Sequence, residues 1–274
     1  MKNFKIEAHI SSAKNLVYKT LLDCLSSKGI KKHNLFMIFG AKAIADFIQR
    51  DPSLARNVLF RGNKLNGVFD ENESHLLRLV SQFPTTSISY LSLESELFAS
   101  LDVAGTHYPI LVVQKPELPE IDLRLPPDGL EILCALGDPS NVGALLRSAA
   151  AFSAKKIVLL KECASPFHPK AIRAASATTL LVPLAQGPSI RDLNNFNSAN
   201  EETSIVALDM SGLPMDQFSW PTSVRILVGE EGLGVPKDLH TQRISIPIHS
   251  EVESLNAVIA TSLALYSYRL SNPS

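Results

Sequence analysis

Three segments in the second half of the sequence place polar residues and glycines where chemistry could occur. In the first, LGDPSNVGALLRSAAAF, residues 138–141 turn a strand into a helix whose only charge between Val142 and Ala154 is Arg147. An unpaired buried guanidinium is costly, so Arg147 either faces water or serves an anionic group in a cleft. Asn141 is equally ambiguous, because Asn at a helix start is a good N-cap without any catalytic role.

The second segment, ILVGEEGLGVP, runs from an apolar strand into Gly229, Gly232 and Gly234. The spacing G-x-x-G-x-G matches neither the dinucleotide fingerprint nor the P-loop. Glu230 and Glu231 repel an anion, so a neutral or cationic ligand is favoured. Taken alone, the segment is explained more simply as a glycine-rich tight turn with two solvated glutamates.

The third segment, ISIPIHSEVESLNAVIATSLALYSYRL, leads into the last helix, for which Ser254 is the expected N-cap. Asn256 adds a short polar side chain near Ile246 and Pro247, and such a helix start can offer amides and hydroxyls to a ligand. The sequence contains no G-x-S-x-G or H-E-x-x-H motif, and its 7 histidines show no metal-ligand spacing. We therefore expect no metal.

The elements that must position these segments alternate between short apolar strands and helices. Strands are expected at LEILCAL, KIVLL, LLVPL, SIVALD and VRILVG, and helices at VGALLRSAAAF, PKAIRAASA and SLNAVIATSLALYSYRL. Nearly all-apolar strands of this kind are typical of a parallel sheet covered by helices on both faces. In such sheets ligands bind at the loops that follow the carboxyl ends of the strands.

The first half of the sequence predicts a separate small α/β domain. A helix is expected from Ser11 or Ser12 to Gly29, followed by LFMIF, AKAIADFIQR, NVLF, LLRLVSQF, SISYL and PILVV. Four prolines between residues 115 and 128 argue against a central strand or helix there. We therefore predict a first domain at 1–114, a linker at 115–128 and a second domain at 129–274.

Composition excludes several classes of protein. The chain has 274 residues, of which 45% are hydrophobic and 19% charged, which argues against disorder and coiled coil. No apolar run reaches the roughly 18 residues of a membrane span, so we expect a cytoplasmic protein without a membrane partner. The 3 cysteines are far apart in the sequence, which suggests buried thiols rather than a disulfide framework.

Charge is distributed unevenly along the chain. The net charge is -1, yet residues 1–64 carry 12 Lys or Arg against 4 Asp or Glu. A polyanion could be held there through phosphate contacts. Ordinary solvated lysines on helix faces are the alternative. The lysines concerned are Lys14, Lys19, Lys28, Lys31, Lys32 and Lys42.

Together and in this order, the three segments resemble the three motifs of the TrmH/SpoU branch of the SPOUT superfamily, which are RNA 2'-O-ribose methyltransferases. The resemblance covers about residues 130 to 270 and, more weakly, residues 5–114 resemble the family's N-terminal RNA-binding domain. The matching positions are Asn141, Gly143 and Arg147, then Gly229, Glu231, Gly232 and Gly234, then Ile246, Pro247, Ser254, Leu255 and Asn256.

The resemblance implies a parallel sheet threaded into a trefoil knot, S-adenosylmethionine as methyl donor, rRNA or tRNA as substrate, and a homodimer whose two subunits build the site. By position, the implied catalytic residues are Asn141, Arg147, Glu231, Ser254 and Asn256. The implied donor contacts are Leu208, Gly229, Gly232, Ile246, Pro247 and Leu255. RNA binding is assigned to Lys14, Lys28, Lys31, Lys32 and Lys42.

Residue chemistry refines these implied roles. A guanidinium stays protonated, so we expect Arg147 to bind the acceptor's phosphate or stabilise the developing alkoxide rather than to act as base. Ser250 and Thr178 stand where family members usually have Gly, and a positive φ at either position would require a different local backbone. The alternative is a catalytically silent RNA-binding or ribosome-assembly factor; a Rossmann dehydrogenase would need a G-x-G-x-x-G motif, which is missing.

Overall fold

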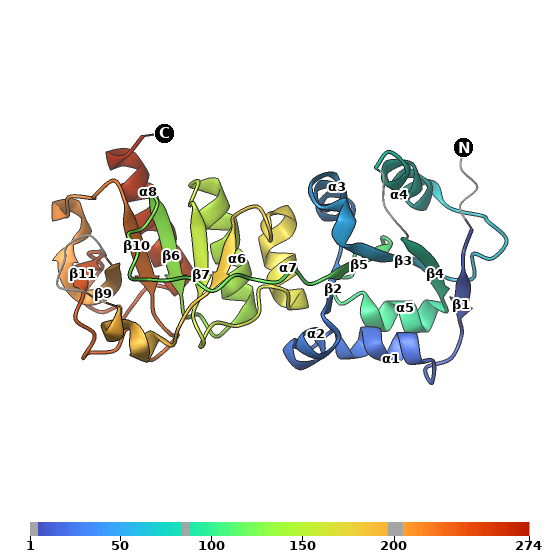
Figure 1. The fold of residues 1–274 in the computed structure, drawn as a ribbon, viewed down its shortest axis with the longest axis horizontal. Coiled ribbons are helices and arrows are strands. Elements are labelled where there is room, and N and C mark those ends of the chain that lie inside the picture. The colour runs from blue at the N-terminus through green and yellow to red at the C-terminus, as the bar shows by residue number, and fades with distance from the viewer. Residues whose placement is uncertain (1–4, 84–87, 197–204, 274) are drawn as a thin grey trace. The chain divides into compact units, whose positions relative to one another are not determined.

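The computed structural model describes residues 5–83, 88–196 and 205–273, and the chain divides into two compact units. The first unit comprises Met1–Glu117 and Phe167–Ala177, and the second comprises Leu118–Pro166 and Thr178–Ser274. The chain therefore leaves the second unit after Pro166 and re-enters it at Thr178. Each unit contains its own sheet (Figure 1).

The first unit has a mixed sheet with helices on both faces. Its strand order is β1-β4-β3-β5-β2, in which β1, β4 and β3 are parallel and β5 runs antiparallel to β3 and β2. Helices α1, α2 and α5 cover one face of this sheet, and α3 and α4 cover the other (Figure 1). The elements are β1 (Ala8–Ile10), α1 (Leu16–Asp23), α2 (Ser27–His33), β2 (Leu35–Ile38), α3 (Ala41–Arg50), β3 (Ala55–Arg61), α4 (Glu71–Ser81), β4 (Ser89–Leu93), α5 (Ser95–Leu101), β5 (Ile110–Gln114) and α7 (Pro169–Ala175).

The single helix expected between Ser11 and Gly29 is wrong, because two helices occupy this stretch. Asn15 caps α1, and Ser26 caps α2 by accepting a hydrogen bond from Gly29 N at 3.1 Å. Gly29 thus lies inside α2 instead of ending a helix. A Cβ at this position would lie 1.9 Å from the carbonyl oxygen of Asp23, so the close approach of the two helices requires glycine.

The second unit has six parallel strands in the order β11-β9-β10-β6-β7-β8, which confirms the predicted parallel α/β sheet. Within the described ranges, no helix is both long and apolar enough to cross a bilayer. The elements are β6 (Leu130–Cys134), α6 (Pro139–Ala151), β7 (Lys156–Leu159), β8 (Leu184–Gln186), η3 (Ile190–Asn195), β9 (Ile205–Pro214), η5 (Met215–Gln217), β10 (Val224–Val228), β11 (Gln242–Ser245) and α8 (Ala257–Ser271).

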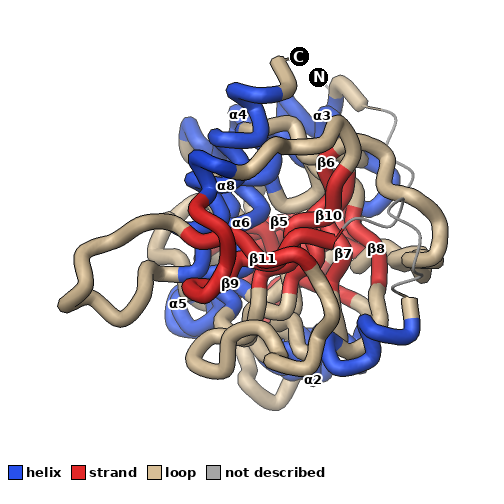
Figure 2. Tube along the Cα trace, turned by 90° about the vertical axis from the view of Figure 1, so that its left-hand side faces the viewer, coloured by secondary structure: helices blue, strands red, loops and turns tan. Residues whose placement is uncertain are grey.

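The two faces of this sheet are covered differently. Helices α6 and α8 pack against each other on one side (Figure 2). The other side carries one buried cluster of apolar side chains from the strands. Leu123 and the η3 residues Ile190 and Leu193 pack into this cluster. A 3-10 helix and an extended segment thus cover a face for which an α-helix was expected.

The proline-rich residues before β6 are held against the second unit. Leu123 is 1% exposed, and Ile121 N donates to the carbonyl oxygen of Gln186 at 3.0 Å. Arg225, on β10, donates to the carbonyl oxygens of Leu123 and Leu125 at 2.9 and 2.8 Å. A buried guanidinium therefore fastens this segment, which we call the strap (residues 118–125).

Two of the three cysteines lie next to each other despite their separation in the sequence. Cys134 ends β6 and is buried, Cys163 is half-buried, and their sulfur atoms are 3.5 Å apart. Cys24 is also a buried free thiol. The expectation of buried free thiols is confirmed for Cys24 and Cys134, whereas Cys163 is a half-buried free thiol. The parallel sheet places the loop after β7 beside the end of β6, which brings Cys163 to Cys134.

Candidate functional site

A cavity of about 450 Å³ opens where β9, β10 and β11 end and α8 begins. This volume lies in the usual range for small-molecule sites. The lining segments are residues 208–210, 228–235, 244–246 and 254–257, together with Ala260. Two of the three motif-bearing segments of the sequence thus form the wall of one cavity.

An excursion of β9 supplies one side of this cavity. The pairing of β11 with β9 jumps from Arg243 opposite Ala207 to Ile244 opposite Leu213, so residues 208–212 bulge away from the ladder. Leu208 and Asp209 thereby reach the cavity. A Cβ at residue 212 would lie 2.4 Å from Arg243 C, which explains why glycine stands where the excursion returns.

The glycine-rich loop after β10 is folded back on itself. Glu230 N donates to the carbonyl oxygen of Gly234 at 3.1 Å, and Gly234 N donates to that of Glu230 at 2.8 Å. A Cβ on Gly229 would lie 2.5 Å from Gly234 C. The tight loop therefore excludes any side chain at residue 229.

Glu231 connects this loop to the loop after β6. Its carboxylate accepts hydrogen bonds from Gly137 N at 2.6 Å, Asp138 N at 3.2 Å and the Asn141 side-chain amide at 3.1 Å. Burial by itself raises the pKa of Glu231, but these donors outweigh it and hold the pKa below the ordinary value. Glu231 is therefore an ionised acceptor that ties the first motif to the second.

The first residues of α6 and α8 differ from expectation in their capping. Asp138 caps α6, so the Asn141 side chain is free to reach Glu231. Asn256, and not Ser254, caps α8, because its Oδ1 accepts from Val258 N at 2.9 Å and Ile259 N at 3.3 Å. Ser254 lies two residues earlier and lines the cavity together with Asn256.

Arg147 is the one implied catalytic residue that is neither in the cavity wall nor bonded to it. It lies exposed on α6, and no ion pair to its guanidinium exists among the residues that the structure describes. The sequence allowed Arg147 either to face water or to serve an anionic group in a cleft. In a single chain, Arg147 faces water.

The implied donor contacts lie at the cavity with one exception. Leu208, Gly229, Gly232, Ile246 and Leu255 line it, whereas the exposed Pro247 does not. Neither Ser250 nor Thr178 has a positive φ, so neither replacement of a family glycine strains the backbone. In the described part of the chain, no group of three or more His, Cys, Asp or Glu side chains could hold a metal ion.

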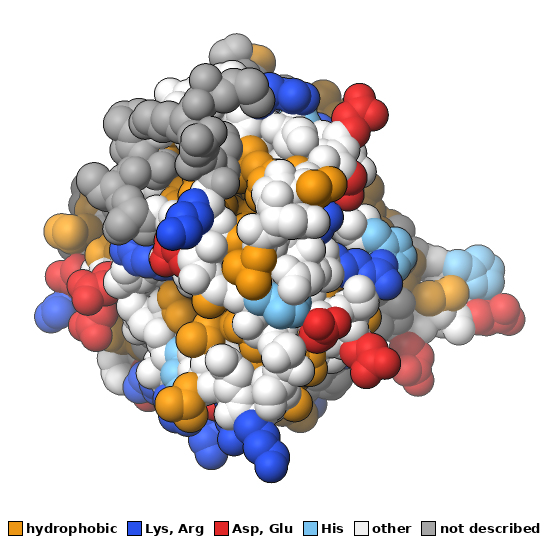
Figure 3. All heavy atoms as spheres, turned by 90° about the vertical axis from the view of Figure 1, so that its right-hand side faces the viewer, with side chains coloured by type: hydrophobic (Ala, Val, Ile, Leu, Met, Phe, Trp, Pro, Cys, Tyr) orange, Lys and Arg blue, Asp and Glu red, His pale blue; other side chains and the backbone are white. Residues whose placement is uncertain are grey.

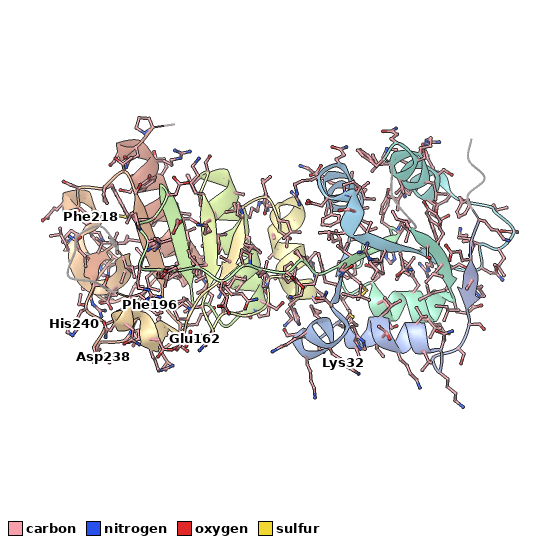
Figure 4. All side chains as sticks on the ribbon, viewed as in Figure 1. Lys32, Glu162, Phe196, Phe218, Asp238 and His240 are labelled. Carbon is pink, nitrogen blue, oxygen red and sulfur yellow. The ribbon has the colours of Figure 1, made fainter. Side chains whose placement is uncertain are left out.

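The implied RNA-binding lysines fall on two faces of the first unit. Lys14 precedes α1 and Lys28, Lys31 and Lys32 lie on α2, while Lys42 is on α3 across the sheet. Lys32 lies at the lower edge of Figure 4, and basic side chains project from the lower edge of Figure 3. The ammonium group of Lys32 lies 3.3 Å from the carboxylate of Asp23, and the Lys32 side chain is 64% exposed. One basic surface, formed by α1 and α2, is therefore available to a polyanion.

Sequence reasoning missed part of the cavity. Asp209 and Met210, at the β9 excursion, and Ser245, at the end of β11, belong to its wall. The expected strand SIVALD ended at residue 209, and β11 has only four residues. The usable signal was Gly212, since a glycine shortly after an apolar strand suggests a bulge.

Residues 131–266 match the SpoU rRNA Methylase family. This stretch of the chain, just under half of it, belongs to that family. A ribosomal RNA small subunit methyltransferase G 2 of Syntrophobacter fumaroxidans is 32% identical over 260 residues, covering 94% of this chain and 48% of that relative. The chain thus spans about half the length of that protein.

Two further similarities extend over nearly the whole chain. The 23S rRNA (guanosine(2553)-2'-O)-methyltransferase RlmP of Bacillus subtilis is 25% identical, covering 95% of this chain and 98% of RlmP. The structure of an AdoMet-bound rRNA methyltransferase from Sinorhizobium meliloti superposes with a TM-score of 0.77 at 20% identity, covering 97% and 98% of the two chains. The latter likeness concerns the fold.

Proposed function

We propose that this SpoU-family protein transfers a methyl group from S-adenosylmethionine to a ribose 2'-hydroxyl of rRNA or tRNA. One observation carries the proposal: the second and third motifs line one cavity, and Glu231 ties the first motif to it at 2.6 to 3.2 Å. A factor that only bound RNA would have no use for this assembled cavity. Membership of an RNA methylase family gives the chemistry.

The residues around the cavity fit a cationic nucleoside. Its wall combines apolar side chains such as Leu208, Ile246 and Leu255 with backbone amides of the glycine loop. Asp209, Glu230 and Glu231 add carboxylates, which favour a sulfonium over an anion. The donor, when bound, supplies an activated methyl group and leaves as a neutral thioether.

The protein's part in an in-line displacement is to align the acceptor and to help remove its proton. Glu231, ionised and accepting three N–H hydrogen bonds, fixes the loop after β6 and the first turn of α6, which carries Asn141. Ser254 offers a hydroxyl at the start of the α8 segment. Arg147 binds the acceptor's phosphate or stabilises the alkoxide that forms as the oxygen attacks.

The position of Arg147 supports a homodimer in which each cavity receives this side chain from the other subunit. Arg147 lies on α6, which packs against α8. On α8, Ile259, Leu263, Tyr266 and Leu270 are 40 to 67% exposed, and such a row of apolar side chains is typical of an interface. We call this surface the α8 face.

The proposal also includes the trefoil knot, an RNA-binding role for the first unit, and a cytoplasmic location. The knot is supported by the placement of β11 outside β9, although β10 separates them in the sequence. RNA binding is supported by the exposed lysines of α2. The named relatives are bacterial rRNA methyltransferases, which supports the location.

Calorimetry with S-adenosylmethionine and a transfer assay with cellular RNA test the proposal. We expect binding by the wild-type protein and its loss in Gly229→Ala, because the added Cβ would collide with Gly234. Asn141→Ala and Arg147→Ala should each abolish transfer and change donor affinity less than about tenfold. No donor binding by the wild-type protein would favour the silent factor, and unchanged turnover in both variants would refute the assigned roles.

A further inference from the structure

Glu230, in the cavity wall, pairs with an arginine that has no part in the function proposed so far. Glu230 lines the cavity next to Glu231, and its carboxylate lies 3.4 Å from Nη2 of Arg191. The side chains are 21% and 62% exposed, respectively. A pair at this distance in which the arginine is mostly exposed contributes little to stability. The Arg191 guanidinium and the Glu230 carboxylate can therefore separate, and each can bind an oppositely charged group of a ligand.

The segment that carries Arg191 is held rigidly. Ser189 caps η3, and Glu162 accepts hydrogen bonds from the Ser189 hydroxyl and from Ile190 N at 3.0 Å. At the other end, the Asn194 amide donates to the carbonyl oxygen of Asp238 at 2.9 Å. Glu162 and Asp238 are labelled in this part of the unit in Figure 4.

The buried residues of η3 leave Arg191 on its outer side. Ile190 and Leu193 are fully buried in the core cluster, so Arg191 and Asp192, the two residues between them, are directed away from the sheet. In the described ranges, the contact with Glu230 is the single hydrogen bond of the Arg191 guanidinium. Most of its five N–H donors are thus available to a carboxylate.

We infer that Arg191 and Glu230 form a subsite for the amino-acid end of the methyl donor, which rests on the proposed function. That end is a zwitterion, with an α-carboxylate and an α-ammonium group on one carbon. Arg191 binds the carboxylate and Glu230 binds the ammonium group, so each charge of the ligand meets its opposite. A single added cation or anion would leave one of the two side chains facing a like charge.

Two thioether ligands isolate this contact. S-adenosylhomocysteine carries the zwitterion, whereas 5'-methylthioadenosine shares the adenosine and the sulfur but lacks it. In calorimetry, Arg191→Ala and Glu230→Gln should each weaken S-adenosylhomocysteine about tenfold, equivalent to about 1.4 kcal/mol. Binding of 5'-methylthioadenosine should stay within about twofold of wild type.

The double variant Arg191→Glu with Glu230→Arg exchanges the two charges. It distinguishes binding of the ligand's charged groups from stabilisation of the loop after β10 by the ion pair. It keeps an ion pair for the glycine loop but inverts the charges that the ligand meets, so we expect the same selective loss. Arg124→Glu is the matched control, since Arg124 is 70% exposed in the same unit and lines no part of the cavity.

The outcomes distinguish the two proposals. Equal weakening of both ligands, or of neither, would overturn the subsite. A loss of affinity for S-adenosylmethionine but not for S-adenosylhomocysteine would also overturn the subsite. Glu230 would then interact with the sulfonium charge and not with the α-ammonium group. If the wild-type protein bound neither adenosine ligand nor the donor, the proposed function itself would fail.

Discussion

The carboxylate of Glu231 shows how a single residue can join two parts of a site. Each of its hydrogen bonds comes from the loop between β6 and α6 or from the first turn of α6. Because the pKa is lowered from its ordinary value of 4.5, the group is charged throughout the neutral range. It is therefore a poor acceptor for the proton that leaves the attacking hydroxyl.

We expect Glu231→Gln to lower kcat by about tenfold to a hundredfold, since hydrogen bonds to a charged group are worth about 1.5–3 kcal/mol. The amide NH₂ would also face the N–H of Gly137. The shape of kcat against pH should stay unchanged between pH 6 and 9. Stability from the carboxylate should be present above pH 4.5 and fade as the pH falls through the lowered pKa.

Disappearance of an inflection between pH 6 and 9 in that variant would make Glu231 the base and contradict this interpretation. Glu231→Asp is the matched control, because it keeps the charge and shortens the reach. We expect it to retain more activity than Glu231→Gln at every pH in that range.

Residue identities at the site were accessible from the sequence, whereas their bonding was not. Spacing and resemblance pointed to Asn141 and Glu231 separately, but nothing in the spacing joins residues 90 positions apart. The same holds for Arg191 and Glu230, which belong to η3 and to the loop after β10, respectively. These hydrogen bonds depend on which strands lie side by side in the sheet, and the spacing of residues along the sequence does not specify that order.

Among the elements, the strap depends on one buried ion pair. Arg225 and Glu131 occupy opposite positions on neighbouring strands, are both 1% exposed, and are 2.8 Å apart. Lys156 also reaches Glu131, at 3.0 Å. Burial raises the pKa of Glu131, but the two cations outweigh it and the pKa is lowered.

We expect Arg225→Ala to destabilise the protein by about 3–5 kcal/mol, because a buried carboxylate loses its partner and two strap carbonyls lose their donor. Urea unfolding measures the change. The double variant Arg225→Met with Glu131→Leu should be more stable than Arg225→Ala, since it removes both charges. A double variant no more stable than the single one would contradict this explanation.

The control for this experiment is Arg124→Ala. Arg124 is 70% exposed and pairs with Asp122 on the surface, so its removal should cost less than about 1 kcal/mol.

Elements with a largely apolar pattern were predicted well, whatever their length. Helix α8 and strand β10 follow from such patterns over 15 and 5 residues, and β2 and β7 from only four residues each. Strand β1 (AHI) and strand β11 (QRIS) were missed because polar residues interrupt their apolar pattern. The break between α1 and α2 was hidden because the apolar positions continue through it, and only Ser26 marks the second helix start.

At the scale of the whole molecule, RNA binding should depend on the surface of α1 and α2. Replacing Lys31 and Lys32 by Ala should weaken RNA binding and reduce the slope of log K against log salt by about 2, because each lysine neutralises about one phosphate. Arg78→Ala is the control, because Arg78 is exposed on α4, across the sheet. A wild-type slope in the double variant would place recognition on another surface.

The proposed homodimer makes a second prediction at this scale. Leu263→Glu puts a charge on the α8 face and should convert a dimer into a 29.8 kDa monomer by sedimentation velocity. Transfer should be lost with it, because Arg147 would no longer reach a cavity. Leu65→Glu, at a residue 58% exposed in the first unit, should remain dimeric and active.

A dimeric Leu263→Glu variant would contradict the α8 face as the interface. A monomer that still transferred methyl groups would instead contradict the sharing of Arg147 between subunits.

The cavity wall begins at Leu208 and is completed at Ala260, so it consists entirely of the last third of the chain. During synthesis from the N-terminus, a ribosome-bound chain lacks this wall until α8 has left the exit tunnel. All residues of the first unit, by contrast, have been synthesised once the chain reaches residue 177. A nascent chain would therefore acquire the proposed RNA-binding surface well before the proposed donor site, and an unfinished copy would be unable to transfer a methyl group.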